Sequence, residues 1–205
     1  IFNSLIEKST RTNDISDEII ERATEDFENK LGFKLEELQK YGIKLTKYKA
    51  GVLSGCAGSG KTTTSDGMVT VFKYSDSGSN LKFAAPSGKA ARRLAESVEG
   101  DAKTIHSLFG IGVESEPFIK KKTGGYQREN SDGGATVYFL DEMAMANTDL
   151  VYNIVRGLNE DDSIYFLGDI KQLQPIGKGS PFKALMQFLP CVELGVSKRA
   201  AEKGK

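Results

Sequence analysis

The stretch AGVLSGCAGSGKTTT, residues 50–64, decides the fold of this chain. Residues 50–54 are small or apolar and predict a strand, and residues 55–62 fit the pattern G-x-x-x-x-G-K-[ST] without a mismatch. The glycines of this pattern let backbone N–H groups turn inward around phosphates, and a helix that starts at Lys61 adds its positive end. The sequence therefore predicts a nucleotide phosphate site between a strand and a helix. The alternative is a glycine-rich turn that matches the pattern by chance. The predicted strand before it and the predicted helix after it argue against that alternative.

Most residues of this pattern have an expected contact with ATP or its metal ion. Lys61 is expected to reach the β- and γ-phosphates, which also gives it a catalytic role, and the hydroxyl of Thr62 is expected to ligate Mg²⁺. The other expected contacts come from the loop and from the first turn of the helix. They are Gly55, Ala57, Gly58, Ser59, Gly60 and Thr63.

An acidic pair, Asp141-Glu142, supplies the second half of the predicted site. It follows a β-branched and aromatic run, residues 137–140, which predicts another strand. Asp141 is expected to hold Mg²⁺ directly or through water, and Glu142 to act as general base on the attacking water. By itself such a pair is often a solvated turn or a helix start. The phosphate loop upstream favours the catalytic interpretation, and the glutamate favours hydrolysis over phosphoryl transfer to a small molecule.

Short apolar runs alternate with helical patterns along the chain. Strands are expected at residues 50–54, 81–85, 137–140 and 164–167, and helices at residues 35–45, from residue 61 and at residues 88–98. This alternation predicts an α/β fold, with a mainly parallel sheet and helices on both faces. Each polar motif follows the carboxyl end of a strand, where open α/β sheets build their ligand sites. Gln172 follows the last of these strands, and it could contact the γ-phosphate or face solvent in a loop.

Two segments fall outside this alternation. Residues 1–33 are highly charged and contain a predicted helix with Ser16 as its N-cap, which we interpret as a helical lead-in or the end of a preceding domain. Residues 110–134 are polar, and their Gly124-Gly125 pair is typical of a β-hairpin turn. A surface insertion without regular structure explains the second segment equally well.

The composition of the chain says more about the cellular compartment than about the activity. The 28 basic and 28 acidic residues cancel, so net charge neither supports nor excludes a nucleic-acid partner. The two cysteines lack metal-ligand spacing and favour a reducing compartment such as the cytoplasm. The sequence shows no signal-peptide pattern and no apolar run of membrane-spanning length. Because it begins with Ile1 rather than Met, we expect it to be a piece of a longer protein.

Five motifs in order carry a resemblance to a known family. They read GCAGSGKTT, APSGKAARRL, TIHSLFG, LDEMAM and GDIKQLQPIGKGSPF, within residues 35–199. In this order and spacing the chain resembles superfamily 1 DNA helicases of the RecD-like, 5′-to-3′ branch, which includes the RecD/TraA type and the phage Dda helicases. The resemblance implies a RecA-like motor domain 1A at residues 34–205 that hydrolyses ATP with Mg²⁺ and tracks single-stranded DNA. It also implies a second RecA-like domain outside this sequence, other recombination or replication proteins as partners, and a bacterial or phage origin.

The resemblance implies further roles, residue by residue. Gln39 matches an adenine-reading glutamine, Gln172 a glutamine that links the γ-phosphate to the DNA site, and Arg199 an arginine that reaches the γ-phosphate. The implied single-strand contacts come from two motifs after the second predicted strand. They are Pro86, Ser87 and Lys89 in the first motif and Thr104 and His106 in the second.

The polar insert at residues 110–134 matches the place of the small 1B element, a hairpin that splits the duplex. Phe118 or Tyr126 would then stack at the fork, with Lys120, Lys121, Lys122 and Arg128 facing phosphates. Packing within the hairpin explains either aromatic residue more simply than a role at the fork, and a lone histidine such as His106 is more often structural than catalytic. Three positions depart from the family pattern: Ala144 stands for a serine, Gln174 for a proline and Ala200 for a glutamine.

Two other classes of function compete with a helicase motor. A P-loop NTPase of another class, such as a small-molecule kinase, would be indifferent to DNA, but it leaves APSGKAARRL and TIHSLFG unexplained. A non-catalytic DNA-binding or assembly module would keep the fold without hydrolysing ATP. The presence of all four expected ATP-site residues argues against it: Lys61, Thr62, Asp141 and Glu142. An RNA substrate is also compatible with tracking of a single strand.

Overall fold

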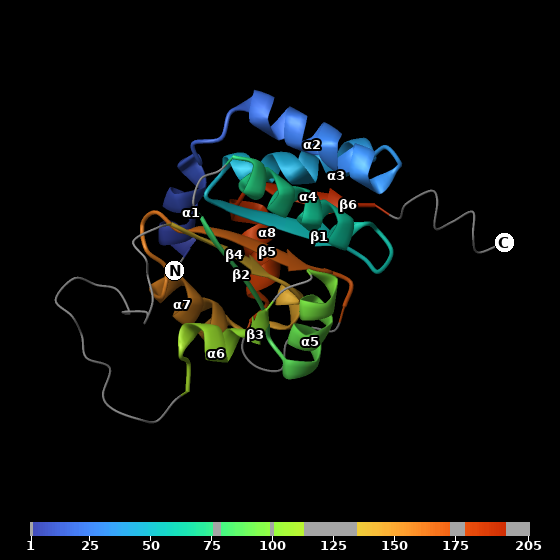
Figure 1. Cartoon of the computed structure of the whole chain (residues 1–205). Helices are drawn as coiled ribbons and strands as arrows, with labels where there is room; N and C mark the ends of the chain where they lie inside the picture. The colour runs from blue at the N-terminus through green and yellow to red at the C-terminus, as the bar shows by residue number, and fades with distance from the viewer. Residues whose placement is uncertain (1, 76–78, 99–100, 113–134, 173–178, 196–205) are drawn as a thin grey trace.

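A six-stranded parallel sheet forms the centre of the computed structural model, which describes residues 2–75, 79–98, 101–112, 135–172 and 179–195 (Figure 1). Its strand order is β3-β2-β4-β5-β1-β6, and every paired neighbour runs parallel. The strands are β1 (Ala50–Gly55), β2 (Asn80–Ala85), β3 (Ala102–Thr104), β4 (Thr136–Leu140), β5 (Ser163–Gly168) and β6 (Cys191–Leu194). The predicted α/β class is confirmed, because β1, β2, β4 and β5 match the four expected strands.

Helices cover both faces of this sheet, as predicted. One face carries α2 (Asp17–Leu31), α3 (Glu37–Lys44), the short η1 (Leu45–Lys47), α4 (Lys61–Tyr74) and α5 (Gly88–Ser97). The other carries α1 (Phe2–Thr10), α6 (Ile105–Phe109), η2 (Met143–Met145), α7 (Thr148–Arg156) and α8 (Pro181–Phe188). The order of the strands produces this division, because right-handed crossovers that run in opposite directions along a sheet place their helices on opposite faces.

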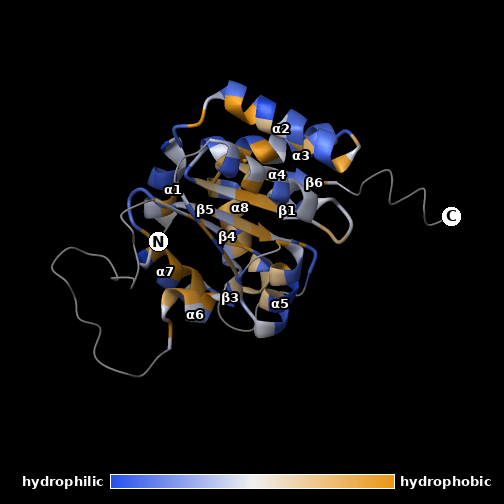
Figure 2. Cartoon of the chain, viewed as in Figure 1, coloured by the Kyte–Doolittle hydropathy of each residue, from blue (hydrophilic) through white to orange (hydrophobic). Residues whose placement is uncertain are grey.

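Alternating side chains of the central strands build two hydrophobic clusters, one on each face. Val52 and Phe166 belong to the cluster under α6, α7 and α8, whereas Leu53 and Tyr165 belong to the one under α2, α3 and α4. The central strands are buried on both faces, as expected of a covered parallel sheet. In Figure 2 the apolar colour lies along the strands and the inner sides of the helices. No described helix is long and apolar enough to span a membrane.

Two edge strands and four helices were not predicted: β3, β6, α1, α6, α7 and α8. The two strands are short and lie at opposite edges of the sheet, where exposed residues such as Lys103 and Glu193 break the apolar pattern. The prediction of Ser16 as N-cap is confirmed, because its side chain accepts a hydrogen bond from the Ile19 N–H at 3.3 Å. Residues 113–134, where the hairpin was predicted, lie outside the described residues.

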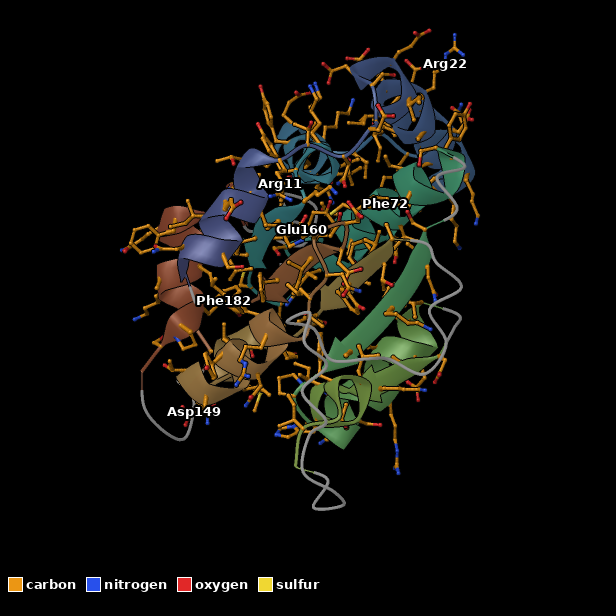
Figure 3. The ribbon with its side chains drawn as sticks, turned by 90° about the vertical axis from the view of Figure 1, so that its left-hand side faces the viewer. Arg11, Arg22, Phe72, Asp149, Glu160 and Phe182 are labelled. Carbon is orange, nitrogen blue, oxygen red and sulfur yellow. The ribbon has the colours of Figure 1, made fainter. Side chains whose placement is uncertain are left out.

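The N-terminal helices share the core of the sheet. Leu5 of α1 is fully buried in one cluster, and Ile20 and Phe27 of α2 lie in the other. The ammonium group of Lys8 donates to the carbonyl oxygens of Asn159, Glu160 and Asp162 at 2.8, 2.9 and 2.7 Å. Beside it Arg11 forms an ion pair with Glu160 at 3.8 Å, and Figure 3 shows the two residues near each other. Within the described chain these helices therefore pack as part of one body with the sheet.

A buried carboxylate fixes α3 against α2. The side chain of Glu28 is 2% exposed and accepts hydrogen bonds from Lys34 Nζ and the Leu35 N–H, both at 2.8 Å, and Lys40 Nζ lies 3.2 Å away. Burial alone would raise the pKa of Glu28, but the hydrogen bonds from Lys34, Leu35 and Lys40 outweigh it and lower the pKa to about 2. Because α3 also carries Gln39, this carboxylate supports one wall of the candidate site.

Replacing Glu28 by Gln is expected to lower the free energy of unfolding at pH 7 by about 1–3 kcal/mol, the range for charge-assisted hydrogen bonds. The carboxyl has an ordinary pKa of 4.5 when unfolded and about 2 when folded. Its contribution is therefore complete above pH 4.5 and is lost as the pH falls towards 2. Urea denaturation at several pH values, with exposed Glu21→Gln as control, measures this. A difference between the unaltered chain and Glu28→Gln that stays constant down to pH 2 would contradict it.

Candidate functional site

The phosphate loop connects the fully buried strand β1 to the first turn of α4. Gly58 and Gly60 adopt left-handed backbone conformations, with φ of 78° and 86°, which only glycine adopts without strain. A Cβ atom at Gly60 would also collide with Nε2 of Gln39. Gly60 is the N-cap of α4 and has no side chain to cap it, so the first N–H groups of the helix point toward the loop. The loop thus has the form that the sequence predicted for an anion cradle.

Lys61 and Asp141 meet above the carboxyl ends of β1 and β4. Lys61 Nζ lies 3.3 Å from Asp141 Oδ1, and the two side chains are 14% and 26% exposed. The same carboxylate oxygen accepts the Glu142 N–H at 2.8 Å, while the Asp141 N–H donates to the Ala84 carbonyl at 2.9 Å. These contacts fix the Asp141 carboxylate toward the phosphate loop. The two sequence motifs are therefore brought together as predicted.

Glu142 has an unusual backbone and an unpaired oxygen. It is the one non-glycine residue with positive φ, at 57°, in the part of the chain that the structure describes. Its Oε2 atom is buried and has no hydrogen-bond partner. Both features cost free energy, and strained residues of this kind cluster at functional sites. The Oε2 atom of Glu142 thus has room for a hydrogen-bond partner that none of the described residues supplies.

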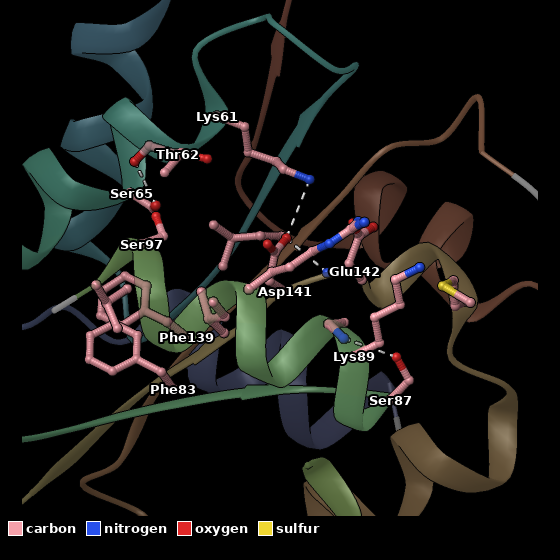
Figure 4. A pocket seen from close by; sticks show the side chains of 16 residues that line it. Lys61, Thr62, Ser65, Phe83, Ser87, Lys89, Ser97, Phe139, Asp141 and Glu142 are labelled. Carbon is pink, nitrogen blue, oxygen red and sulfur yellow. Dashed lines mark hydrogen bonds and ion pairs between the residues drawn. The ribbon is translucent and has the colours of Figure 1, made fainter. Parts of the chain in front are cut away.

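A pocket of ≈ 320 Å³ lies between α4 and α5. Lys61, Asp141 and Glu142 all line it. Figure 4 shows Phe83 and Phe139 at one end, Ser87 and Lys89 at the other, and Lys61 and Asp141 between them. The two phenyl rings stack with their centroids 5.5 Å apart. The remaining lining residues are Thr62, Ser65, Ala90, Arg93, Leu94, Ser97, Val98, Glu142, Met145 and Leu167.

The residues of this pocket fit a nucleotide with a divalent cation. The hydroxyl of Thr62 and the carboxylate of Asp141 are hard oxygen ligands at the pocket wall. Among the described residues no cluster of three or more His, Cys, Asp or Glu side chains could hold a metal without other ligands. Such a pair suits a cation that takes its other ligands from phosphates and water, as in P-loop proteins. The unpaired Oε2 atom of Glu142 gives an independent reason to expect a polar ligand here.

Gln39 lies against the phosphate loop. Its Oε1 atom accepts the Glu36 N–H at 2.9 Å as half of a capping box at the start of α3. Its Nε2 atom packs so closely on Gly60 that a Cβ atom there would collide with it. The side-chain NH₂ group therefore faces the loop, while the oxygen is taken by the cap. A glutamine three residues after an N-cap is a sequence signal that could have predicted this second role.

The predicted DNA-contact residues lie at the carboxyl ends of β2 and β3. Ser87 caps α5 by accepting the Ala90 N–H at 3.2 Å, and Thr104 caps α6 by accepting the Ser107 N–H at 3.2 Å. These capping roles were not predicted, although Ser and Thr are among the preferred N-caps. Pro86 immediately precedes Ser87, and His106 is exposed on α6. Ser87 and Lys89 line the pocket, whereas Pro86, Thr104 and His106 do not.

Several other predicted residues lie away from the pocket or outside the described chain. Gln172 is exposed, donates its N–H to the Asp169 carbonyl at 3.0 Å and does not line the pocket. Ala144 is buried next to Gly168, whose Cβ position would be 3.0 Å from the Ala144 nitrogen. The residues outside the described chain are Phe118, Lys120, Lys121, Lys122, Tyr126, Arg128, Gln174, Arg199 and Ala200.

Comparisons with known sequences agree with this geometry. A family model described as an AAA domain matches residues 35–204. The ATP-dependent RecD2 DNA helicase of Deinococcus radiodurans is 29% identical over 160 residues, which cover 78% of this chain and 21% of that protein. The RecD subunit of the RecBCD enzyme of Haemophilus influenzae is 27% identical over 162 residues, covering 67% of this chain and 24% of that protein. The chain thus spans about a quarter or less of the length of these relatives.

Solved structures share the fold. The UvsW helicase of bacteriophage T4 superposes with a TM-score of 0.54 at 11% identity, covering 89% of this chain and 69% of that one. The Pif1 helicase of Candida albicans gives a TM-score of 0.53 at 20% identity, covering 83% and 42%. At these identities the similarity concerns the RecA-like arrangement of sheet and helices.

Proposed function

The chain belongs to the AAA domain family whose model spans residues 35–204, and from this premise we propose that it is the ATP-hydrolysing motor domain of a DNA helicase that moves 5′ to 3′ on single-stranded DNA. The resemblance to RecD-like helicases that its motifs carry is confirmed by its similarity to RecD2 and RecD. The observation that carries the proposal is the meeting of Lys61, Asp141 and Glu142 in one pocket beside the phosphate loop.

The roles of these side chains in hydrolysis follow from their positions. Lys61, now paired with Asp141 at 3.3 Å, would exchange this partner for the β- and γ-phosphates. Thr62 and Asp141 would hold the divalent cation, which we propose to be Mg²⁺ and whose charge offsets that of the phosphates. The unpaired Oε2 atom of Glu142 would accept a proton from the water that attacks the terminal phosphorus. Gln172 and Arg199 are proposed further contacts with that phosphate.

We propose that single-stranded DNA lies along the carboxyl edge of the sheet. The first turns of α5 and α6 point to this edge, and they carry the proposed contacts of Pro86, Ser87, Lys89, Thr104 and His106. Contacts of this kind are made with the phosphate backbone and imply little sequence specificity. We propose that a second RecA-like domain closes over the nucleotide, so that closing and opening move the strand.

The proposal is tested by ATP hydrolysis measured with and without an oligothymidine strand. We expect a slow basal rate that rises with single-stranded DNA, because the strand and the nucleotide site share α5. Binding of a fluorescent oligothymidine should weaken steeply as salt rises. ATP hydrolysis that ignores both DNA and RNA, without strand binding, would favour a P-loop NTPase of another class. If an oligouridine strand stimulated ATP hydrolysis equally, the domain would not distinguish ribose from deoxyribose.

A further inference from the structure

One face of α5 lines the pocket along most of the length of the helix. Lys89, Arg93 and Ser97 follow one another at four-residue spacing and all line the pocket. Residues so spaced lie on the same side of a helix, about 6 Å apart along its axis. Ala91, on another side of the helix, is buried. The orientation of α5 is therefore fixed with this polar row facing the pocket.

The position of Arg93 within this row places it opposite the reactive groups. Figure 4 shows Lys89 at one end of the pocket and Ser97 toward the other, near Ser65 and Phe139. Arg93 lies midway between Lys89 and Ser97 on the helix and lines the same pocket, with part of its side chain exposed to solvent. Figure 4 shows Lys61 and Asp141 in the middle part of the pocket.

The charges of the pocket leave Arg93 available for an anion. Lys61, Lys89 and Arg93 face two carboxylates, Asp141 and Glu142. Only Lys61 and Asp141 form an ion pair within 4 Å among the described lining residues. Arg93 therefore has no carboxylate partner in the described chain, although it shares the pocket with the unpaired Glu142 oxygen. A strongly anionic ligand would balance these charges better than the contacts among the described residues do.

We propose that Arg93 binds the terminal phosphate of ATP and thereby distinguishes ATP from ADP. The inference rests on the proposed function, because it assumes that the phosphates follow the loop toward Lys61. The loop N–H groups hold the inner phosphates, so the terminal phosphate projects past Lys61 toward Asp141 and Glu142. The planar guanidinium of Arg93 can donate two hydrogen bonds to such a phosphate from the opposite wall.

This contact would link the nucleotide to the other end of the same helix. Arg93 lies a turn and a half beyond Ser87, the N-cap of α5, and one turn beyond Lys89. Ser87 and Lys89 are proposed DNA contacts, so one short rigid element would sense the phosphate and carry strand contacts. A shift of Arg93 on binding the phosphate would therefore move Ser87 and Lys89 as well, through the backbone of α5.

The test compares two neighbouring arginines of α5. Both residues are exposed, but Arg93→Gln removes a charge that lines the pocket, whereas Arg92→Gln removes one that does not. We expect Arg93→Gln to weaken binding of a non-hydrolysable ATP analogue about tenfold or more, as loss of a charge-assisted bond implies, and binding of ADP less than about twofold. Arg92→Gln should change neither, and Arg93→Lys should retain part of the preference. Calorimetric titration measures both affinities for the unaltered chain and the three variants, and circular dichroism checks that each is folded.

Each outcome decides between the proposals. An equal loss of both nucleotides in Arg93→Gln and Arg93→Lys would overturn the inference, and so would unchanged binding in both. A loss of the ATP analogue alone in Arg93→Gln, with partial recovery in Arg93→Lys, would support it. Failure of the unaltered chain to bind either nucleotide would instead contradict the proposed function, and the inference with it.

Discussion

Replacing Glu142 by Gln is expected to slow ATP hydrolysis about 10²- to 10⁴-fold, the range for loss of a general base. Binding of ATP should stay within about twofold of the unaltered chain, because the amide has nearly the same shape and the phosphate contacts are made by other residues. The Glu142 N–H bond to Asp141, at 2.8 Å, belongs to the backbone and survives the change. The variant should therefore hold ATP without turning it over.

The structure gives this prediction a specific basis. The Oε2 atom of Glu142 is buried and unpaired, so its carboxylate has no structural hydrogen bond to lose there. The positive φ of 57° is a backbone property that Gln would have to adopt as well, and it should affect the two proteins equally. A lower melting temperature that accounts for the lost rate would contradict the proposed role. Asp149→Asn, an exposed carboxylate at the start of α7, serves as control and should hydrolyse ATP normally.

The sequence predicted the parts of this site that depend on local chain geometry. The glycines of the phosphate loop, the strand before it and the helix after it are encoded in one short stretch, so their arrangement needs no distant contact. Asp141 was predictable for a related reason, since the carboxyl ends of parallel strands meet at the same edge of a sheet. Strands β1, β4 and β5 have the nearly continuous apolar runs that burial on both faces requires.

Other features depend on contacts that no short pattern records. Arg93 and Ser65 line the same pocket only because the fold brings α5 and α4 to the same end of the sheet. The burial of Glu28 arises from three donors on a different helix and its preceding loop, so nothing next to it in the sequence suggests it. The short strand β6 pairs with β1 at the edge, and its register is set by that neighbour. Tertiary packing, rather than local propensity, decides these positions.

Replacing Lys61 by Ala is expected to weaken binding of both ATP and ADP by about a hundredfold or more. That loss corresponds to about 2.7 kcal/mol, within the range for charge-assisted hydrogen bonds to phosphate. Hydrolysis should fall further, by a total of about 10²–10³-fold or more, because Lys61 would also stabilise charge that develops in the transition state. Lys73→Ala, an exposed lysine in the last turn of the same helix, is the matched control.

Loss of stability should not explain the effect of Lys61→Ala. The ion pair with Asp141 spans 3.3 Å between side chains that are only 14% and 26% exposed, so removing Lys61 leaves a largely buried carboxylate and should cost about 1–3 kcal/mol, which a folded chain tolerates. A variant that unfolds in the same urea range as the unaltered chain, yet binds no nucleotide, would locate the phosphates at Lys61. Glu142→Gln and Lys61→Ala thus predict opposite signatures, binding without hydrolysis and folding without binding. Full nucleotide affinity in Lys61→Ala would place the phosphates elsewhere and remove the basis of the proposed motor.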